Sequence, residues 1–154
     1  MFKIKNILLP TDFSATSLTA AEYALELANE YKANLHVLHV LEKMPPILAI
    51  RSLDLSREKI RQSIDADAQL QLDECIKKIK KIRDAEIIPA IRKGVDFEEI
   101  IKYSKEKKID LIVIATHGRT GILHTLLGSV AEKVIRYSKI PVLGITGTGG
   151  AGKS

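Results

Sequence analysis

The sequence of 154 residues is poor in several residue types: it has no tryptophan, one cysteine and only 5% aromatic residues. The single cysteine, Cys75, excludes an internal disulfide and has no partner at metal-site spacing, so we interpret it as a packing residue. A chain without disulfides suits a reducing compartment, and we therefore predict a cytoplasmic location.

Long apolar runs and a dominant charge sign are also absent. The longest apolar runs have the length of a strand, too short to cross a membrane, and residues 1–6 lack the apolar region of a signal peptide. The 24 basic and 19 acidic residues are well mixed and give a net charge of +5, which suits a small acidic ligand. The lysines between residues 77 and 81 have no aromatic residues among them, and we interpret them as a solvated helix face. We predict neither a nucleic acid nor a membrane as a partner.

What the sequence does contain is an alternation of strand and helix patterns, with 45% hydrophobic residues. Short apolar runs predict five strands, at Lys5–Pro10, Leu35–Leu41, Glu86–Arg92, Leu111–Ala115 and Pro141–Ile145. Helical spacing predicts four helices between them, through Leu18–Ala28, Ser56–Ile82, Asp96–Lys107 and Val130–Arg136, with an irregular stretch at Glu42–Leu55. This alternation predicts one α/β domain whose parallel sheet has helices on both faces.

Local signals add detail to these elements. Pairs of residues at capping-box spacing are Thr19 with Glu22, Asp96 with Glu99, and Ser129 with Glu132. The buried stripe predicted for the long helix is Ile60, Ile64, Ala68, Leu72, Ile76, Ile79 and Ile82. Pro89 cannot donate a hydrogen bond within a sheet, which places its strand at an edge.

The predicted ligand site lies beyond the carboxyl ends of the two most apolar strands, the first and the fourth. In open α/β sheets, ligands bind where the loops after the central strands separate, here between Pro10–Ser14 and Ala115–Ser129. The second of these loops carries Gly118 and Gly121, and a helix starts near Ser129. Glycines allow a close approach, and the free amides of a helix start favour an anion such as phosphate.

These residues resemble the ATP-binding branch of the universal stress protein family. The family signature is G-x2-G-x9-G-[ST]; here Ala115 replaces the first glycine, Gly118 is the second, and Gly128-Ser129 follow after nine residues. Pro10–Ser14 and His39-Val40 also match, and the resemblance covers almost all of residues 1–145. It implies a Rossmann-like, doubly wound sheet with strand order 3-2-1-4-5 in a domain spanning residues 1–146, followed by a flexible, Gly-rich tail at 147–154.

The resemblance also implies a ligand, namely ATP, or ADP or AMP, together with Mg²⁺. Asp12 corresponds to a contact on the nucleoside side and Val40 to a backbone contact with adenine, while Gly118, Gly128 and Ser129 fall near the phosphates and ribose. The implied binding residues are Pro10, Thr11, Asp12, Val40, Ala115, Thr116, His117, Gly118, Arg119, Gly128, Ser129 and Val130. Family members commonly pair through the last strand, so we expect a homodimer through Pro141–Ile145.

Several of these residues have a second interpretation. Asp12 could form an Asx-turn or cap the first helix, and Ser129 could simply cap the last one. Arg119 could be solvated, and His117 could be a general base, although no orienting partner is evident in the sequence. Ala115 would cost little if its backbone has ordinary strand angles, but its methyl could crowd a ligand.

Three functions remain open from the sequence. The first is a nucleotide-dependent regulatory switch in the stress response. The second is a slow ATPase or phosphotransferase, for which the sequence offers no compact catalytic constellation. The third is a stress-related interaction protein that binds no nucleotide. Residues 147–154 fit the P-loop pattern G-x4-G-K-[ST], but this pattern needs a helix directly after it, and the sequence stops at Ser154.

Overall fold

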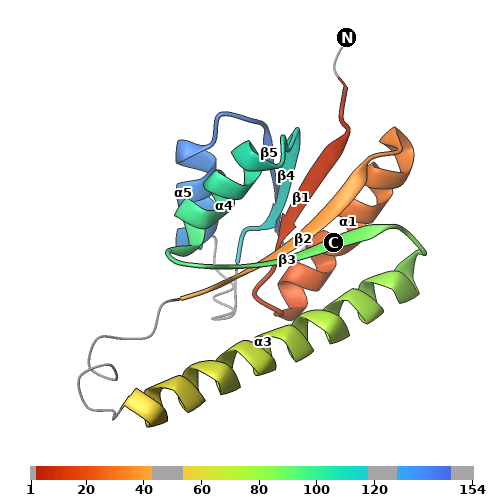
Figure 1. Ribbon diagram of the computed structural model, residues 1–154. Coiled ribbons are helices and arrows are strands. Elements are labelled where there is room, and N and C mark those ends of the chain that lie inside the picture. The colour runs from red at the N-terminus through yellow and green to blue at the C-terminus, as the bar shows by residue number, and fades with distance from the viewer. Residues whose placement is uncertain (1–2, 43–53, 118–127, 147–154) are drawn as a thin grey trace.

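The computed structural model describes residues 3–42, 54–117 and 128–146, and in the first turn of α3 (residues 54–57) only the backbone. Strands and helices alternate along these residues (Figure 1). Their bounds are β1 (Asn6–Pro10), α1 (Ala15–Tyr31), β2 (Asn34–Leu41), α3 (Asp54–Ile82), β3 (Ile87–Lys93), α4 (Asp96–Glu106), β4 (Leu111–Ala115), α5 (Ser129–Tyr137) and β5 (Val142–Ile145). The five strands and four helices predicted from the sequence are confirmed.

The strands form one parallel sheet in the order β3-β2-β1-β4-β5, as predicted. β1 lies at the centre, where Ile7 is paired with Leu35 of β2 and with Leu111 of β4. β3 is an edge strand, so Pro89 needs no hydrogen-bond acceptor on its outer side.

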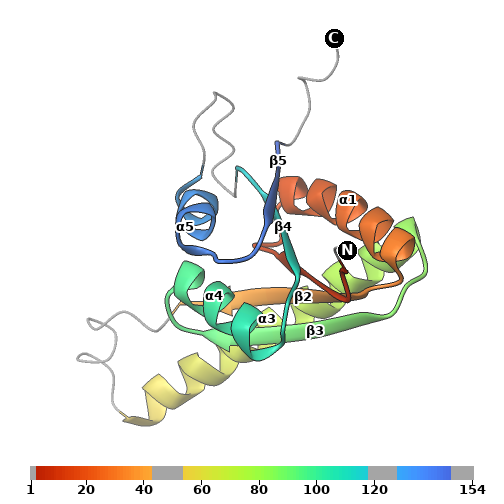
Figure 2. The same cartoon turned by 90° about the horizontal axis from the view of Figure 1, so that it is seen from above.

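Two helices cover each face of the sheet, as Figure 2 shows: α1 and α3 on one face, α4 and α5 on the other. Ile7 and Leu9 of β1 pack in the cluster under α1 and α3, and Leu8 packs in the cluster under α4 and α5. All three are at most 1% exposed, and burying each such side chain contributes about 1.5–3 kcal/mol. Among the described residues, none of the helices has the length and apolarity of a membrane span.

The buried stripe predicted for α3 is only partly correct. Ala68, Leu72 and Ile79 are buried, but Ile60 and Ile64 are 38% and 42% exposed, and Ile82 at the helix end is 44% exposed. At about 1.5 Å per residue, a 29-residue helix is much longer than the seven-residue strand β3, so the amino-terminal half of α3 extends past the sheet (Figure 1). The apolar periodicity of α3 thus continues into residues that the sheet does not cover.

The helix starts also differ from those suggested by capping-box spacing. Ser14 caps α1 and accepts a hydrogen bond from the Ser17 amide, whereas Thr19 lies inside the helix. The N-caps of α4 and α5 are Val95 and Gly128, neither of which makes a side-chain capping bond. Asp96 and Ser129 are therefore the first residues of their helices and not their caps.

A buried histidine connects β2 to its neighbours. The imidazole of His36, which is 5% exposed, lies 3.2 Å from Asn6 Oδ1 through Nε2 and 2.7 Å from the Tyr103 hydroxyl through Nδ1. Because an amide oxygen only accepts, Nε2 carries the hydrogen and Nδ1 accepts from Tyr103. Burial, and secondly the charge of Lys107, lower the pKa of His36 below its ordinary 6.5. A proton on Nδ1 would also remove the acceptor of the Tyr103 hydroxyl.

We expect acidification below pH 6.5 to destabilise the fold through His36. The unfolded chain binds this proton more readily than the folded one, so the free energy of unfolding falls as the pH falls from 6.5 toward the folded-state pKa. Urea unfolding at pH 7.5 and pH 5.5 measures this loss. The His36→Gln variant, which cannot titrate here, should lose less stability between the two pH values. Equal losses in both proteins would contradict this interpretation.

Candidate functional site

The loop after β1 is fixed by its own side chains. The Thr11 amide donates to the Leu38 carbonyl at 2.8 Å and so continues the pairing with β2 by one residue. Thr11 Oγ1 accepts from the Phe13 amide at 3.0 Å, and Asp12 Oδ1 accepts from the Ser14 amide at 2.9 Å. Asp12 therefore forms the Asx-turn that the sequence suggested, and this turn leads into α1.

Phe13 takes a left-handed backbone conformation, with φ of 68°, which is unfavourable for a bulky residue. Such a conformation costs about 1–3 kcal/mol and persists only where the surroundings impose it. Here the Phe13 ring stacks on His39 at a centroid distance of 4.1 Å, and His39 Nδ1 donates to the Thr11 carbonyl at 2.8 Å. These contacts bind the β1 loop to the carboxyl end of β2, directly before the partly buried Val40.

Directly after β4, Thr116 makes contacts with two other parts of the chain. Its amide donates to the Ile145 carbonyl at 2.9 Å, and its Oγ1 donates to the same oxygen at 3.2 Å. Its carbonyl accepts from the Gly128 amide at 2.6 Å. Thr116 is 8% exposed and thus joins β4, the last strand and the start of α5.

α5 begins at this point. Gly128 is its extended N-cap, and the Gly128 amide is already bonded to Thr116. The amides of Ser129 and Val130 stand in the first turn, where the helix provides no acceptor. Ser129 is exposed. The first turn of α5 therefore presents donors that can meet an anion, whereas the Gly128 amide is already occupied.

A direct contact joins the β1 side and the β4 side. Thr16, in the first turn of α1, donates from Oγ1 to the His117 carbonyl at 2.6 Å. The structure thus brings the loops after β1 and β4 and the start of α5 to one edge of the sheet. Whether these residues contact a ligand stays a prediction, and Gly118 and Arg119 lie outside the described residues.

The ring of His117 is held by its neighbour. Thr116 Oγ1 gives its only hydrogen to Ile145, so it accepts from His117 Nδ1, 3.2 Å away. His117 Nε2 is buried and has no hydrogen-bond partner among the described residues.

The structure shows whether Ala115, which replaces the first glycine of the family signature, strains the backbone. Ala115 is the last residue of β4, is paired with Ile145 in the sheet, and is not among the described residues with positive φ. Its methyl packs against the core cluster under α1 and α3. An alanine at this position therefore causes no backbone strain.

Several residues around this site carry no signal in the sequence. Thr16 reaches a residue 101 positions away, and Ser17 Oγ lies 2.9 Å from Thr11 Oγ1. A Cβ at Gly144 of β5 would lie 2.8 Å from the Thr116 methyl, so the glycine is needed for this packing. A glycine within a predicted strand is the one available hint, since it often marks a close approach.

Cys75 of α3 is half-buried and packs against the core cluster under α1 and α3. Burial raises the pKa of the Cys75 thiol, and this outweighs the opposite effects of Thr11 and Lys78. The thiol is therefore protonated at neutral pH and unreactive, which fits its interpretation as a packing residue.

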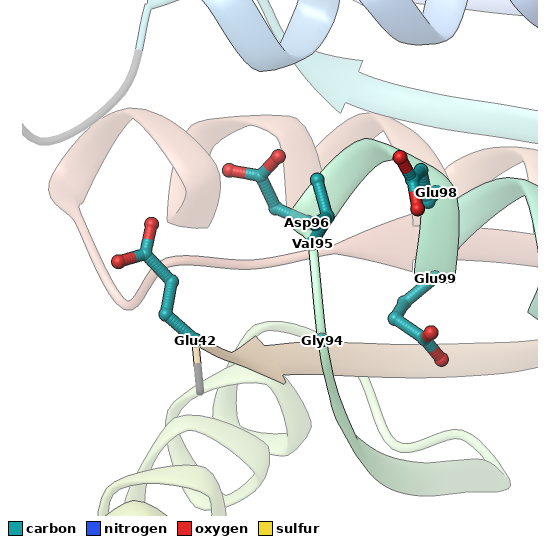
Figure 3. Close-up of a pocket in the computed structure, with 6 residues that line it drawn as sticks. All are labelled: Glu42, Gly94, Val95, Asp96, Glu98 and Glu99. Atoms are coloured by element: carbon teal, nitrogen blue, oxygen red, sulfur yellow. The ribbon is translucent and has the colours of Figure 1, made fainter. Parts of the chain in front are cut away.

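A cavity of about 300 Å³ lies at the same edge of the sheet, beside β2 and β3. Figure 3 shows the residues that line it: Glu42, Gly94, Val95, Asp96, Glu98 and Glu99. Three of its carboxylates belong to the first turn of α4, where they are stabilised by the positive end of the helix dipole. A cavity with this charge repels phosphate, and it contains none of the predicted site residues.

A parallel sheet with its loops and helix starts gathered at one edge defines a doubly wound α/β protein of the kind that binds ligands at this edge. The model of the universal stress protein family matches residues 3–145, and the chain belongs to this family. It is 37% identical to the universal stress protein MJ0531 of Methanocaldococcus jannaschii over 142 residues, 90% of this chain and 80% of the relative.

Solved structures agree with this assignment. The structure of MJ0577, a universal stress protein of the same archaeon, has a TM-score of 0.79, is 27% identical and covers 96% of this chain and 99% of its own. A universal stress protein from Archaeoglobus fulgidus in complex with dAMP has a TM-score of 0.66 at 23% identity and covers 95% of this chain and 100% of its own. At 23% identity, the similarity to the Archaeoglobus fulgidus structure shows a shared fold only.

We expect Gly144→Ala to destabilise the protein by about 1–3 kcal/mol, because the added methyl meets a buried, hydrogen-bonded Thr116. The double variant with Thr116→Ser lacks the obstructing methyl but keeps the hydroxyl, so it should regain most of this loss. Urea unfolding of the two single variants and the double variant measures the coupling. Additive effects would show that the contact is not the cause.

Proposed function

We propose that this protein binds an adenine nucleotide at the carboxyl edge of the sheet and acts as a nucleotide-dependent regulator of the stress response. The observation that carries this proposal is the convergence of the Asp12 turn, the end of β4 and the first turn of α5 in a chain of this family. Regulation of this kind needs no catalytic groups, only a nucleotide that binds one conformation of the protein more tightly than another.

The charges at this edge of the sheet support one orientation of the bound nucleotide. The first turn of α4 holds Asp96, Glu98 and Glu99, whereas that of α5 holds only Glu132 and that of α1 holds no acidic residue. Phosphates are therefore favoured at α5 and disfavoured beside α4. The base then lies toward the end of β2, where family resemblance assigns a backbone contact to Val40 and a nucleoside contact to Asp12.

The relatives support the adenine base more than the number of phosphates. The Archaeoglobus fulgidus protein of the same fold holds dAMP, which has one phosphate. We propose ATP as the physiological ligand, with ADP and AMP as weaker ones. The described residues contain no group of three metal-ligating side chains, so Mg²⁺ would be held mainly by the phosphates themselves.

We further propose that the protein forms a homodimer along β5. β5 is an edge strand of four residues, and Leu143 on it is 40% exposed. An apolar edge with unpaired backbone groups favours pairing with another strand, and a second copy of β5 would satisfy both. The nucleotide site lies beside this edge, since Thr116 bonds to Ile145.

The proposed phosphate contact can be tested at one backbone amide. Proline is tolerated at the first position of a helix, and Gly128, with φ of −62° and ψ of 151°, has the conformation required before proline. Ser129→Pro therefore removes one amide donor without breaking α5, and Ser129→Ala keeps that donor. We expect the proline variant to bind ATP about tenfold more weakly or worse, since a hydrogen bond to a charged group contributes about 1.5–3 kcal/mol. The alanine variant should lose less.

Two measurements check this expectation. Denaturing the purified wild-type protein and identifying the released molecule should yield adenine nucleotide, and less should be released from the proline variant. Calorimetric titration with ATP, ADP and AMP, with and without Mg²⁺, then gives the affinities. A wild-type protein that releases no nucleotide and binds none in titration would overturn the proposed function.

The dimer is tested by a charge at the exposed edge. Leu143→Lys should convert dimers into monomers, because pairing two β5 strands would place the two lysines close together. Ile88→Lys is the matched control: Ile88 is also 40% exposed but lies on β3, at the opposite edge of the sheet. Light scattering at micromolar concentration distinguishes the outcomes. A wild-type monomer, or equal dissociation of both variants, would contradict pairing along β5.

A further inference from the structure

Thr116 is bonded to both the proposed nucleotide site and the last strand. On one side, its carbonyl accepts from the Gly128 amide at 2.6 Å, and Gly128 is the N-cap of the helix whose first turn would hold phosphate. On the other side, its amide and its hydroxyl both donate to the carbonyl of Ile145, the last residue of β5. A displacement of the α5 start is thereby passed directly to β5.

The side chain of Thr116 has little freedom to absorb such a displacement. Its Oγ1 donates to Ile145 and accepts from His117 Nδ1, which fixes its rotamer from two sides. Its methyl is placed against Gly144, where a Cβ would approach within 2.8 Å. His117 is itself held by Thr16 of α1 through its carbonyl. The residue therefore behaves as a rigid joint between α5, α1 and β5.

Among the described strands, β5 is the shortest, and it lies at an edge of the sheet. Four residue pairs with β4 hold it in the sheet, and its other edge has no strand beside it in the described chain. Its bond to Thr116 is the last rung of this short ladder. Loss of that rung would free the carboxyl end of β5, because backbone pairing at the end of an edge strand opens easily.

We propose that Thr116 is a positioning residue that couples occupancy of the nucleotide site to the order of β5. This inference rests on the proposed function and extends it to regulation: phosphate bound at α5 tightens the Gly128–Thr116–Ile145 chain of bonds and orders the edge of β5. By linkage, any partner that requires an ordered β5 edge also strengthens nucleotide binding by the same factor.

Amide hydrogen exchange, followed by NMR, measures the coupling directly. In the wild-type protein, saturation with ATP and Mg²⁺ should slow exchange of the Thr116 and Ile145 amides about tenfold more than it slows exchange of the Ala90 amide, which faces β2 in the pairing of β3. The comparison with β3 is needed because ligand binding stabilises the whole fold and slows every amide that exchanges through global unfolding.

Three substitutions test whether the coupling depends on the Thr116 side chain. Thr116→Val keeps the shape but loses both hydroxyl bonds, and the excess slowing should fall below about twofold. Thr116→Ser keeps the hydroxyl and should restore most of it. Gly144→Ala displaces the joint from the β5 side, outside the site, and should also reduce the excess. Thermal unfolding of each variant confirms that it is folded.

The outcomes separate this inference from the proposed function. If calorimetry detects nucleotide binding to the wild type but the Ile145 and Ala90 amides slow equally, the coupling is wrong and the proposed function stands. If the excess slowing is the same in the wild type, Thr116→Val and Gly144→Ala, the coupling exists but does not depend on the Thr116 side chain, and the proposed positioning role is wrong. If no nucleotide binds to the wild type, both are overturned.

Discussion

The structure depends on the two hydrogen-bonded ladders of β1. This five-residue strand is paired with β2 on one side and β4 on the other, and it is buried on both faces. At its amino end, Asp110 Oδ2 accepts from the amides of Lys5 and Asn6, and at its carboxyl end the Thr11 amide continues to β2. Because all strands are parallel, their carboxyl ends lie at one edge of the sheet. The pairing of β1 with its neighbours therefore brings the loops of the site to that edge.

A division of charge follows from this arrangement. The helices α1, α4 and α5 begin at the carboxyl edge, and each offers a partial positive charge there. The acidic first turn of α4 neutralises the positive end of that helix. The first turn of α1, after the Asp12 turn, has no acidic residue, and that of α5, after Thr116, has only Glu132. One edge of the sheet is thus divided into a region that repels anions and a region that attracts them.

The sequence predicted the sheet well because its signals are strong and local. Apolar runs ending at Pro10 and Ala115 could only be buried strands, and Pro89 marked an edge. The helix caps were harder to predict: Ser14, Thr16, Ser17 and Thr19 can all cap a helix, and their assignment depends on partners such as Thr11 and His117. The motif located the end of β4 and the start of α5. It could not show that Gly144 makes room for Thr116, since that contact joins two strands that meet only in the folded sheet.

The length of α3 has a consequence for how the protein opens. Its carboxyl-terminal half is fixed by Leu72 and Ile79. The half that extends past the sheet has exposed isoleucines, side-chain pairs along its own surface, and one ion pair from Asp65 to Lys93 of β3. Pairs between exposed side chains stabilise a helix only weakly. We therefore expect the amino-terminal turns of α3 to open more readily than the turns that the sheet covers, without unfolding of the whole protein.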